Sequence, residues 1–256
     1  AALDEAAEVV SDLDNWQEHW PSFVEKSNST RSELRLSAFQ SMNKVLTARY
    51  VGYEDFEPFI EPTFDALHEA ILNYASRSEH DEALGVFCNM SLNCFSEFEH
   101  YVQVFLDNII PTLSGISEDE AFRFFTVAFS VAISVSNSEL SLRTFNFFYN
   151  LLMNKKSRST EFTTEMLAEC VKSVGILLSS FPDEVIADNL ASQIEDLIDQ
   201  MVSNQRAPLI LAAIDLIPIV YEAILSNEAP ANSEEHANAI QSKHFTAKYK
   251  SKISNL

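Results

Sequence analysis

Glycine is scarce in this sequence, and its scarcity excludes most β-sheet architectures. Only four glycines occur in 256 residues, whereas tight hairpins and phosphate-binding loops need residues that accept positive φ. The hydrophobic fraction of 46% is nevertheless enough for a sizeable core in a chain of this length. The sequence therefore predicts a globular all-α protein whose helices are joined by short polar segments.

Long hydrophobic runs and cysteine pairs are also missing. We find no run of the roughly 18 to 20 apolar residues that a membrane span requires, and no signal-peptide pattern at the first residues. Cys88, Cys94 and Cys170 are odd in number and form no CxxC pair, so we expect reduced thiols in the core. These features predict a soluble cytoplasmic protein with no membrane partner, and the nucleus is a second candidate compartment.

Basic residues are few and unevenly distributed. The formal net charge is −21, with 17 lysines and arginines against 38 acidic residues. Residues 1–242 contain all 38 acids but only 13 of the basic residues. For the basic residues near the first repeat, solvation of the surface is favoured over partner contact, whereas for a basic loop and a basic tail solvation and phosphate contacts are equally good explanations. The candidate residues for binding a partner are Arg31, Arg35, Lys155, Lys156, Arg158, Lys243, Lys248, Lys250 and Lys252.

Motifs of catalysis and of cofactor binding are absent from the sequence. It contains no GxxxxGK[ST], GxGxxG or GxSxG, and His68 with Glu69 fails the HExxH zinc pattern because position 72 is leucine. Acidic clusters such as Glu118–Glu120 fall in the first turns of predicted helices, where the helix dipole favours negative charge. We therefore predict no enzymatic activity, no catalytic residue, no cofactor, no bound metal and no small-molecule substrate.

Apolar residues recur at three- and four-residue steps along most of the chain, as is typical of amphipathic helices. The helix pairs follow one another at steps of about 48, 38, 43 and 46 residues, near the roughly 40 to 47 of HEAT and armadillo repeats. We expect the pairs to open near Arg31, Glu79, Ser117, Thr160 and Arg206. The sequence thus predicts a HEAT/armadillo-like α-solenoid of about five antiparallel helix pairs, and a single helical bundle is the alternative. The repeat domain is expected over residues 1–226, with a linker and a basic tail or helix over 227–256.

Aromatic residues gather in two places, and each admits two interpretations. Trp16, Trp20 and Phe23 form either a lid over the first repeat or an exposed docking patch, and the burial tendency of large aromatics favours the lid. Seven phenylalanines between Phe122 and Phe148 belong to the third pair. They are expected to lie in the core, with an aromatic groove for a partner helix as the alternative.

Prolines are expected to mark the ends and bends of helices. Pro58 and Pro62, with Gly52, predict an interruption, so the second helix of the first pair is expected to begin near Pro62. Pro182 should start a helix that continues to Val202. Pro218 lies within the last predicted helix, Ala207–Leu225, where we expect a kink.

Two segments carry a resemblance to a known family. In residues 30–50, TRSELRLSAFQSMNKVLTARY, the spacing of basic, apolar and aromatic positions resembles the opening repeat of the interferon-related developmental regulator family. Residues 211–222, LAAIDLIPIVYE, are similar to the segment that closes that family's helical domain, although Asp215 and Pro218 replace the usual Glu and an ordinary helix residue. The resemblance covers about residues 3–226.

The resemblance implies a helical-repeat protein without enzymatic activity, linked to translational silencing at the tRNA sites of idle ribosomes and to transcriptional co-regulation. We accordingly expect a non-catalytic ribosome-binding protein that silences or hibernates idle ribosomes, with rRNA and ribosomal proteins as partners. The basic residues would contact rRNA, and the acidic body would contact basic ribosomal proteins. The alternative is a protein-binding scaffold or transcriptional co-regulator that grips a peptide in its concave face.

Overall fold

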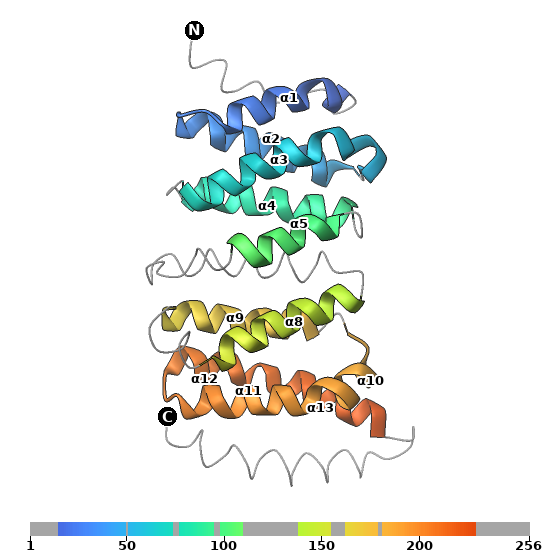
Figure 1. The fold of residues 1–256 in the computed structure, drawn as a ribbon, viewed down its shortest axis with the longest axis vertical. Coiled ribbons are helices and arrows are strands. Elements are labelled where there is room, and N and C mark those ends of the chain that lie inside the picture. Colours follow the sequence, from blue (N-terminus) through green and yellow to red (C-terminus); the bar gives the residue numbers. More distant parts are fainter. Residues whose placement is uncertain are drawn as a thin grey trace.

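A computed structural model describes residues 15–49, 51–73, 77–94, 98–109, 138–154, 162–178 and 181–228. Within these ranges every regular element is helical, and the helices stack one above another along the long axis of the molecule (Figure 1). Residues 1–14 lie outside the described residues. So do the first helix of the third pair and the C-terminal tail.

The N-terminal half, residues 15–109, contains the first two helix pairs and a helix that precedes them. Its elements are α1 (Trp16–Ser27), α2 (Ser32–Ala48), α3 (Tyr53–Asn73), α4 (Arg77–Cys94), α5 (Glu99–Val104) and the π-helical turn η4 (Phe105–Ile109). α1 packs against α2 and α3, while α4 packs against α2 and α3. The rings of Trp20 and Phe56 meet edge to face with centroids 4.8 Å apart. Trp16, Trp20 and Phe23 are all buried, which confirms the predicted lid.

The prolines of α3 do not interrupt it. α3 begins at Tyr53 and contains both Pro58 and Pro62, so the prediction that its helix starts near Pro62 is wrong. Both prolines are exposed, whereas the opposite face of the helix buries Phe56 and Ile60. Because most helical stability in proteins comes from packing of the apolar face, the helix persists although two backbone N–H donors are missing on its solvent side.

The C-terminal half, residues 138–228, follows the same plan. Its elements are α8 (Ser138–Met153), α9 (Thr164–Leu178), α10 (Asp183–Val185), the π-helical turn η7 (Ile186–Leu190), α11 (Ala191–Ser203), α12 (Ala207–Ile214) and α13 (Leu216–Glu228). α10, η7 and α11 follow without a break and together form the long helix predicted from Pro182. α9 packs against α8 and α12, and α11 packs against α8, α12 and α13.

A break at Asp215 divides the last long helix into α12 and α13. Pro218, in the first turn of α13, has no N–H for the carbonyl of Ile214 and crowds it with its ring, so the predicted kink is confirmed. Residues 207–224 are long and apolar enough to cross a membrane by length and composition alone. The break, the exposed Asp215 and Glu222, and the packing against α9 and α11 are typical of a core helix in a repeat stack.

The helices form two layers. The first, named here the α2 layer, consists of α2, α4, α9 and α12, in which α2 packs on α4 and α9 packs on α12. The second, the α3 layer, consists of α3, α5 with η4, α8, and α11 with η7 and α10. Its members meet through Phe64 and Tyr101, whose ring centroids are 5.0 Å apart, through polar contacts between α5 and α8, and through packing of α8 on α11.

Buried apolar side chains of both halves belong to one core cluster, which extends from Trp16 to Ala223 among the described residues. α2, α4, α9 and α12 begin at Ser32, Arg77, Thr164 and Ala207, close to the four predicted openings that can be compared. The predicted opening at Ser117 lies outside the described residues. The fold is therefore an all-α HEAT/armadillo-like solenoid, in which stacking of pairs makes a continuous core.

Candidate interaction surface

The structure places only two of the predicted partner-binding residues. Arg31 is exposed at the N-cap of α2, where its backbone N–H donates to Ser29 Oγ at 3.2 Å. Its guanidinium therefore lies on the surface, as a partner-binding role requires. The remaining candidates lie outside the described residues and stay predictions: Lys155, Lys156, Arg158, Lys243, Lys248, Lys250 and Lys252.

Arg35 is a correction to the predicted surface. Its side chain is 7% exposed and forms an ion pair with Glu79, with 2.8 Å between Arg35 Nε and Glu79 Oε1. Arg35 Nη1 also donates to the carbonyl oxygen of Ser29 at 2.8 Å. Because a buried charge needs a partner, Arg35 is committed to joining α2 to α4 and is removed from the candidate contacts with rRNA.

Charge is divided unequally between the two layers. The helices of the α2 layer contain six acidic and four basic residues. Those of the α3 layer contain 15 acidic residues and a single basic one, Arg143. The acids are Glu54, Asp55, Glu57, Glu61, Asp65, Glu69, Glu99, Asp107, Glu139, Asp183, Glu184, Asp188, Glu195, Asp196 and Asp199. Among the described helices of the two layers, the negative charge is thus concentrated on the α3 layer.

The most regular part of this charge is a stripe on α3, named here the α3 stripe: Glu57, Glu61, Asp65 and Glu69. The four residues follow at four-residue steps and are all exposed. Side chains at this spacing lie on one face of a helix, about 6 Å apart along its axis. No lysine or arginine occurs between Arg49 and Arg77, so the stripe has no cation on its own helix.

Aromatic side chains border the α3 stripe. Tyr101 of α5 is half-buried beside Phe64, and the Tyr53 hydroxyl donates to Glu57 Oε1 at 3.3 Å. The pKa of Tyr101 is raised, first by burial and then by Glu61, Tyr53 and Asp65. The negative charges of Glu61 and Asp65 on α3 thus contribute to the raised pKa of Tyr101 on α5. In the C-terminal half the pKa of Tyr149 is also raised, first by burial and then by Asp196.

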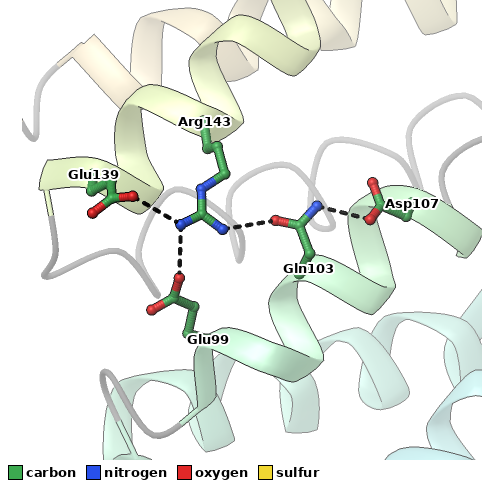
Figure 2. A network of polar contacts seen from close by, with 5 residues as sticks. All are labelled: Glu99, Gln103, Asp107, Glu139 and Arg143. Atoms are coloured by element: carbon green, nitrogen blue, oxygen red, sulfur yellow. Dashed lines mark hydrogen bonds and ion pairs between the residues drawn. The ribbon is translucent and has the colours of Figure 1, made fainter.

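Arg143 is the one basic residue of the α3 layer, and carboxylates surround it (Figure 2). Its Nη2 lies 3.1 Å from Glu99 Oε1 on α5 and 3.3 Å from Glu139 Oε1 on α8. Its Nη1 lies 3.5 Å from Gln103 Oε1, and Gln103 in turn donates to Asp107 Oδ2 at 2.9 Å. The guanidinium therefore links α8 to α5, and its surroundings show how this layer holds a cation.

The cysteine thiols lie in the core. Cys88, Cys94 and Cys170 form no disulfide and are buried, as predicted. Burial, and secondarily Glu169, raises the pKa of the Cys170 thiol, which keeps the sulfur protonated and unreactive. Among the residues that the structure describes, no group of three or more His, Cys, Asp or Glu side chains is arranged to hold a metal ion.

The α3 stripe was missed at the sequence level, although a signal for it exists. Glu57, Glu61 and Asp65 share a four-residue spacing, and the segment around them has no basic residue. The expected helix start near Pro62 hid this pattern, since it placed Glu57 and Glu61 in a connecting segment. A stripe becomes evident only when the helix is continued through both prolines.

Comparison with known proteins identifies a family. A family model described as interferon-related developmental regulator (IFRD) matches residues 2–256. No curated protein matches the chain significantly. Among solved structures, a designed armadillo repeat protein is 16% identical with a TM-score of 0.43, over 86% of this chain and 97% of that one. A second engineered protein is 10% identical with a TM-score of 0.38, over 87% of this chain and 98% of that one.

Proposed function

Because the chain belongs to the interferon-related developmental regulator family, we propose that it is a non-catalytic, cytoplasmic ribosome-binding protein that silences idle ribosomes at their tRNA sites. Stacked helix pairs present long faces to partners, and the family and the fold together indicate an interaction scaffold. The ribosome is the partner that accounts for both signs of charge on this chain. It offers phosphate to basic residues and lysine-rich proteins to acidic ones.

Segregation of charge is the observation that carries the proposal. Seven basic residues fall into two short groups, Lys155–Arg158 and Lys243–Lys252, in an otherwise acidic chain. An acidic body repels RNA, so in the proposed complex these two groups and the exposed Arg31 make the phosphate contacts. In the proposed complex the two basic groups contact rRNA, while the α3 layer faces ribosomal proteins.

Cosedimentation of the full chain with purified ribosomes over a salt series tests this division of roles. Lys155→Gln/Lys156→Gln and Lys250→Gln/Lys252→Gln should each weaken binding. They should also flatten the dependence of log affinity on log salt by about 0.7 to 0.9 for each phosphate that the variant no longer neutralises. Lys44→Gln/Lys172→Gln removes the same charge from exposed lysines of α2 and α9 and is the matched control. If all three double variants bind alike, the two basic groups have no role in ribosome binding.

The charge of the α3 layer favours a second candidate, a scaffold or co-regulator that binds a protein and not RNA. Such a scaffold would remain in the light fractions of a native lysate on a sucrose gradient. A ribosome-bound protein would migrate with monosomes, dissociate in high salt and shift after RNase treatment. The gradient therefore separates the two candidates before any variant is made.

A further inference from the structure

We propose that the edge of the stack at which the helices of the α2 layer begin binds the sugar-phosphate backbone of an RNA duplex. This edge, named here the opening edge, consists of the segments that precede and begin α2, α4, α9 and α12: residues 28–32, 74–77, 154–164 and 204–207. The inference rests on the proposed function for the choice of RNA. It extends that function to Arg77 and Arg206, to which no role has been assigned.

One short sequence pattern recurs in all four segments. An arginine follows a hydroxyl or amide residue and precedes a small residue, in STRS (29–32), ASRS (75–78), KSRS (156–159) and NQRA (204–207). The arginines are Arg31, Arg77, Arg158 and Arg206. The predicted opening of the third pair, at Ser117, lacks the pattern. Because the pattern follows the repeat, it points to one role that is repeated along the stack.

Contacts between helix starts place these segments along the same edge. The ion pair of Arg35 with Glu79 joins the start of α2 to the start of α4, and Arg206 Nη1 donates to Thr164 Oγ1 at 2.7 Å between the starts of α12 and α9. Arg143, near the start of α8, pairs with the first residue of α5, so the two halves have the same orientation. The helices of the α2 layer therefore begin at one edge of the stack (Figure 1). Packed helices lie about 8–10 Å apart, so the four segments form a row.

The charge of the opening edge is opposite to that of the rest of the chain. Its four segments contain six basic residues and one acidic residue, although acids outnumber bases by 38 to 17 in the whole sequence. At the opposite edge, the segments that precede and begin α3, α5 and α10 are residues 49–53, 95–99 and 179–183. They contain one basic and three acidic residues. A polyanion such as RNA is therefore attracted to the opening edge and repelled by the other edge.

Helix stability does not account for arginine at these positions. The helix dipole disfavours a cation at the N-terminus, and serine, threonine, aspartate and asparagine are the preferred N-caps. Arg31 and Arg206 are nevertheless the N-cap residues of α2 and α12, and neither helix has a side-chain cap hydrogen bond. In the α3 layer, α3 and α5 have acidic residues in their first turns, as the dipole favours. The arginines of the α2 layer thus stand where stability alone would select other residues, and an anionic ligand explains them.

The described arginines of this edge are available to a ligand. Arg31 and Arg206 are exposed, and no carboxylate of the described residues pairs with either guanidinium. Elsewhere Arg35, Arg143 and Lys172 each pair with a carboxylate. Guanidinium, hydroxyl and amide groups are those that contact phosphate and sugar oxygens, and duplex RNA is recognised mainly through these atoms. A row held at fixed spacing by packed helices suits the regular backbone of a duplex, because neither partner has to be ordered on binding.

The test is fluorescence anisotropy of the full chain with a labelled RNA duplex of about 16 base pairs, over a salt series. Arg77→Gln/Arg206→Gln should weaken binding about tenfold at physiological salt and lower the slope of log affinity against log salt by about 0.9 for each lost phosphate contact. Lys44→Gln/Lys172→Gln removes the same charge from exposed residues of α2 and α9 and should change the affinity by less than about twofold. Arg77→Lys/Arg206→Lys keeps the charge and should restore most of the affinity. Circular dichroism checks that each variant is folded.

The proposal is overturned if the duplex fails to bind, or if the two glutamine double variants weaken binding equally, since net charge would then explain the effect. Tighter binding of a single-stranded RNA of the same sequence would also overturn it, because the edge would then follow a flexible strand. The ribosome experiment uses lysine variants in which Arg77 and Arg206 are intact. If those variants lose ribosome binding while Arg77→Gln/Arg206→Gln binds the duplex normally, only the role of the opening edge is wrong. The reverse result would reject the proposed ribosome contacts alone.

Discussion

The two halves of the molecule share an architecture but differ in what they bury. In the N-terminal half the buried polar residues include a charged pair, an imidazole and an amide: Arg35, Glu79, His80 and Asn93. In the described part of the C-terminal half they are hydroxyl residues only, Ser141, Thr144 and Ser173. The helix pairs are stacked similarly in both halves. The difference in buried polar residues therefore bears on how each pair is held in register with the next pair.

Direct polar contacts align α2 with α4. Asn93 Oδ1 accepts from the Val51 N–H at 2.8 Å, and Asn43 bonds both Glu82 and Asn89 across the two helices. The matching contact of α9 with α12 buries aliphatic side chains, and the buried residues of α12 are Leu209, Ile210, Ala212 and Ala213. Polar pairs permit one register, whereas aliphatic surfaces are more tolerant of sliding. We infer that polar side-chain contacts fix the alignment of the helix pairs in the N-terminal half, whereas the fit of aliphatic surfaces fixes it in the C-terminal half.

The largest expected effect comes from breaking the buried ion pair. Glu79→Ala leaves the Arg35 guanidinium buried without its carboxylate and should lower the free energy of unfolding by about 3–5 kcal/mol. Urea denaturation of the full chain, followed by circular dichroism, measures this loss. Ser173→Ala is the matched change in the C-terminal half. It removes a buried hydroxyl that bonds the Glu169 carbonyl and should cost less than about 1 kcal/mol.

Replacing both members of the ion pair separates charge burial from packing. Arg35→Met/Glu79→Leu fills the space without charges, and its unfolding free energy should be close to that of the wild type. A double variant as unstable as Glu79→Ala would show that packing, and not the unpaired charge, causes the loss.

A smaller effect is expected for the buried amide. Asn93→Leu leaves the Val51 N–H without its acceptor and should cost about 1–3 kcal/mol. In the C-terminal half, Thr144 Oγ1 is buried, and no described group hydrogen-bonds it. Thr144→Val should therefore be neutral or slightly stabilising in the same denaturation experiment. Equal losses for Asn93→Leu and Thr144→Val would contradict the difference between the halves.

Two helix glycines face a polar and an aliphatic neighbour: Gly85 of α4 faces Asn43 of α2, and Gly175 of α9 faces Leu216 of α13. A Cβ at Gly85 would lie 3.0 Å from Asn43 Nδ2, which is held by hydrogen bonds to Glu82. A Cβ at Gly175 would lie 3.1 Å from Leu216 Cδ2, the end of a flexible aliphatic chain. Alanine gains about 0.5–1 kcal/mol in a helix interior over glycine. Gly85→Ala should be destabilising by about 1 kcal/mol, whereas Gly175→Ala should be neutral or stabilising. Thermal unfolding of both variants measures whether each substitution stabilises or destabilises the protein.

Periodicity predicted the fold well because each pair must bury an apolar face every 40 or so residues. The pair openings, the Trp16 and Trp20 lid and the kink before Pro218 follow from that constraint and from local backbone chemistry. The continuation of α3 through Pro58 and Pro62 could not be predicted locally. It depends on burial of Phe56 and Ile60 against other helices, which outweighs the two missing donors.

The surface was less predictable than the fold. Arg31 and Arg35 are equivalent in sequence, four residues apart in a basic group, yet one is exposed and the other is buried. What separates them is Glu79, which lies one repeat later and reaches Arg35 only after α2 and α4 have stacked. A tertiary partner of this kind leaves no mark on the local pattern.

The smallest expected effect concerns the contact between the halves. Arg143 on α8 reaches Glu99 on α5 at 3.1 Å, but its side chain is 48% exposed. Exposed pairs are weak and screened by salt, so Arg143→Ala should lower the unfolding free energy by less than about 1 kcal/mol at low salt and not measurably at 1 M salt. Glu99→Gln should reproduce this loss, because it removes the link between the halves. Glu139→Gln, which alters a pair within α8, should have less effect. If Arg143→Ala still lowers the unfolding free energy at 1 M salt, Arg143 stabilises the protein by packing and not by its charge. The contact between the halves would then depend on the fit of side chains, as the contact of α9 with α12 does.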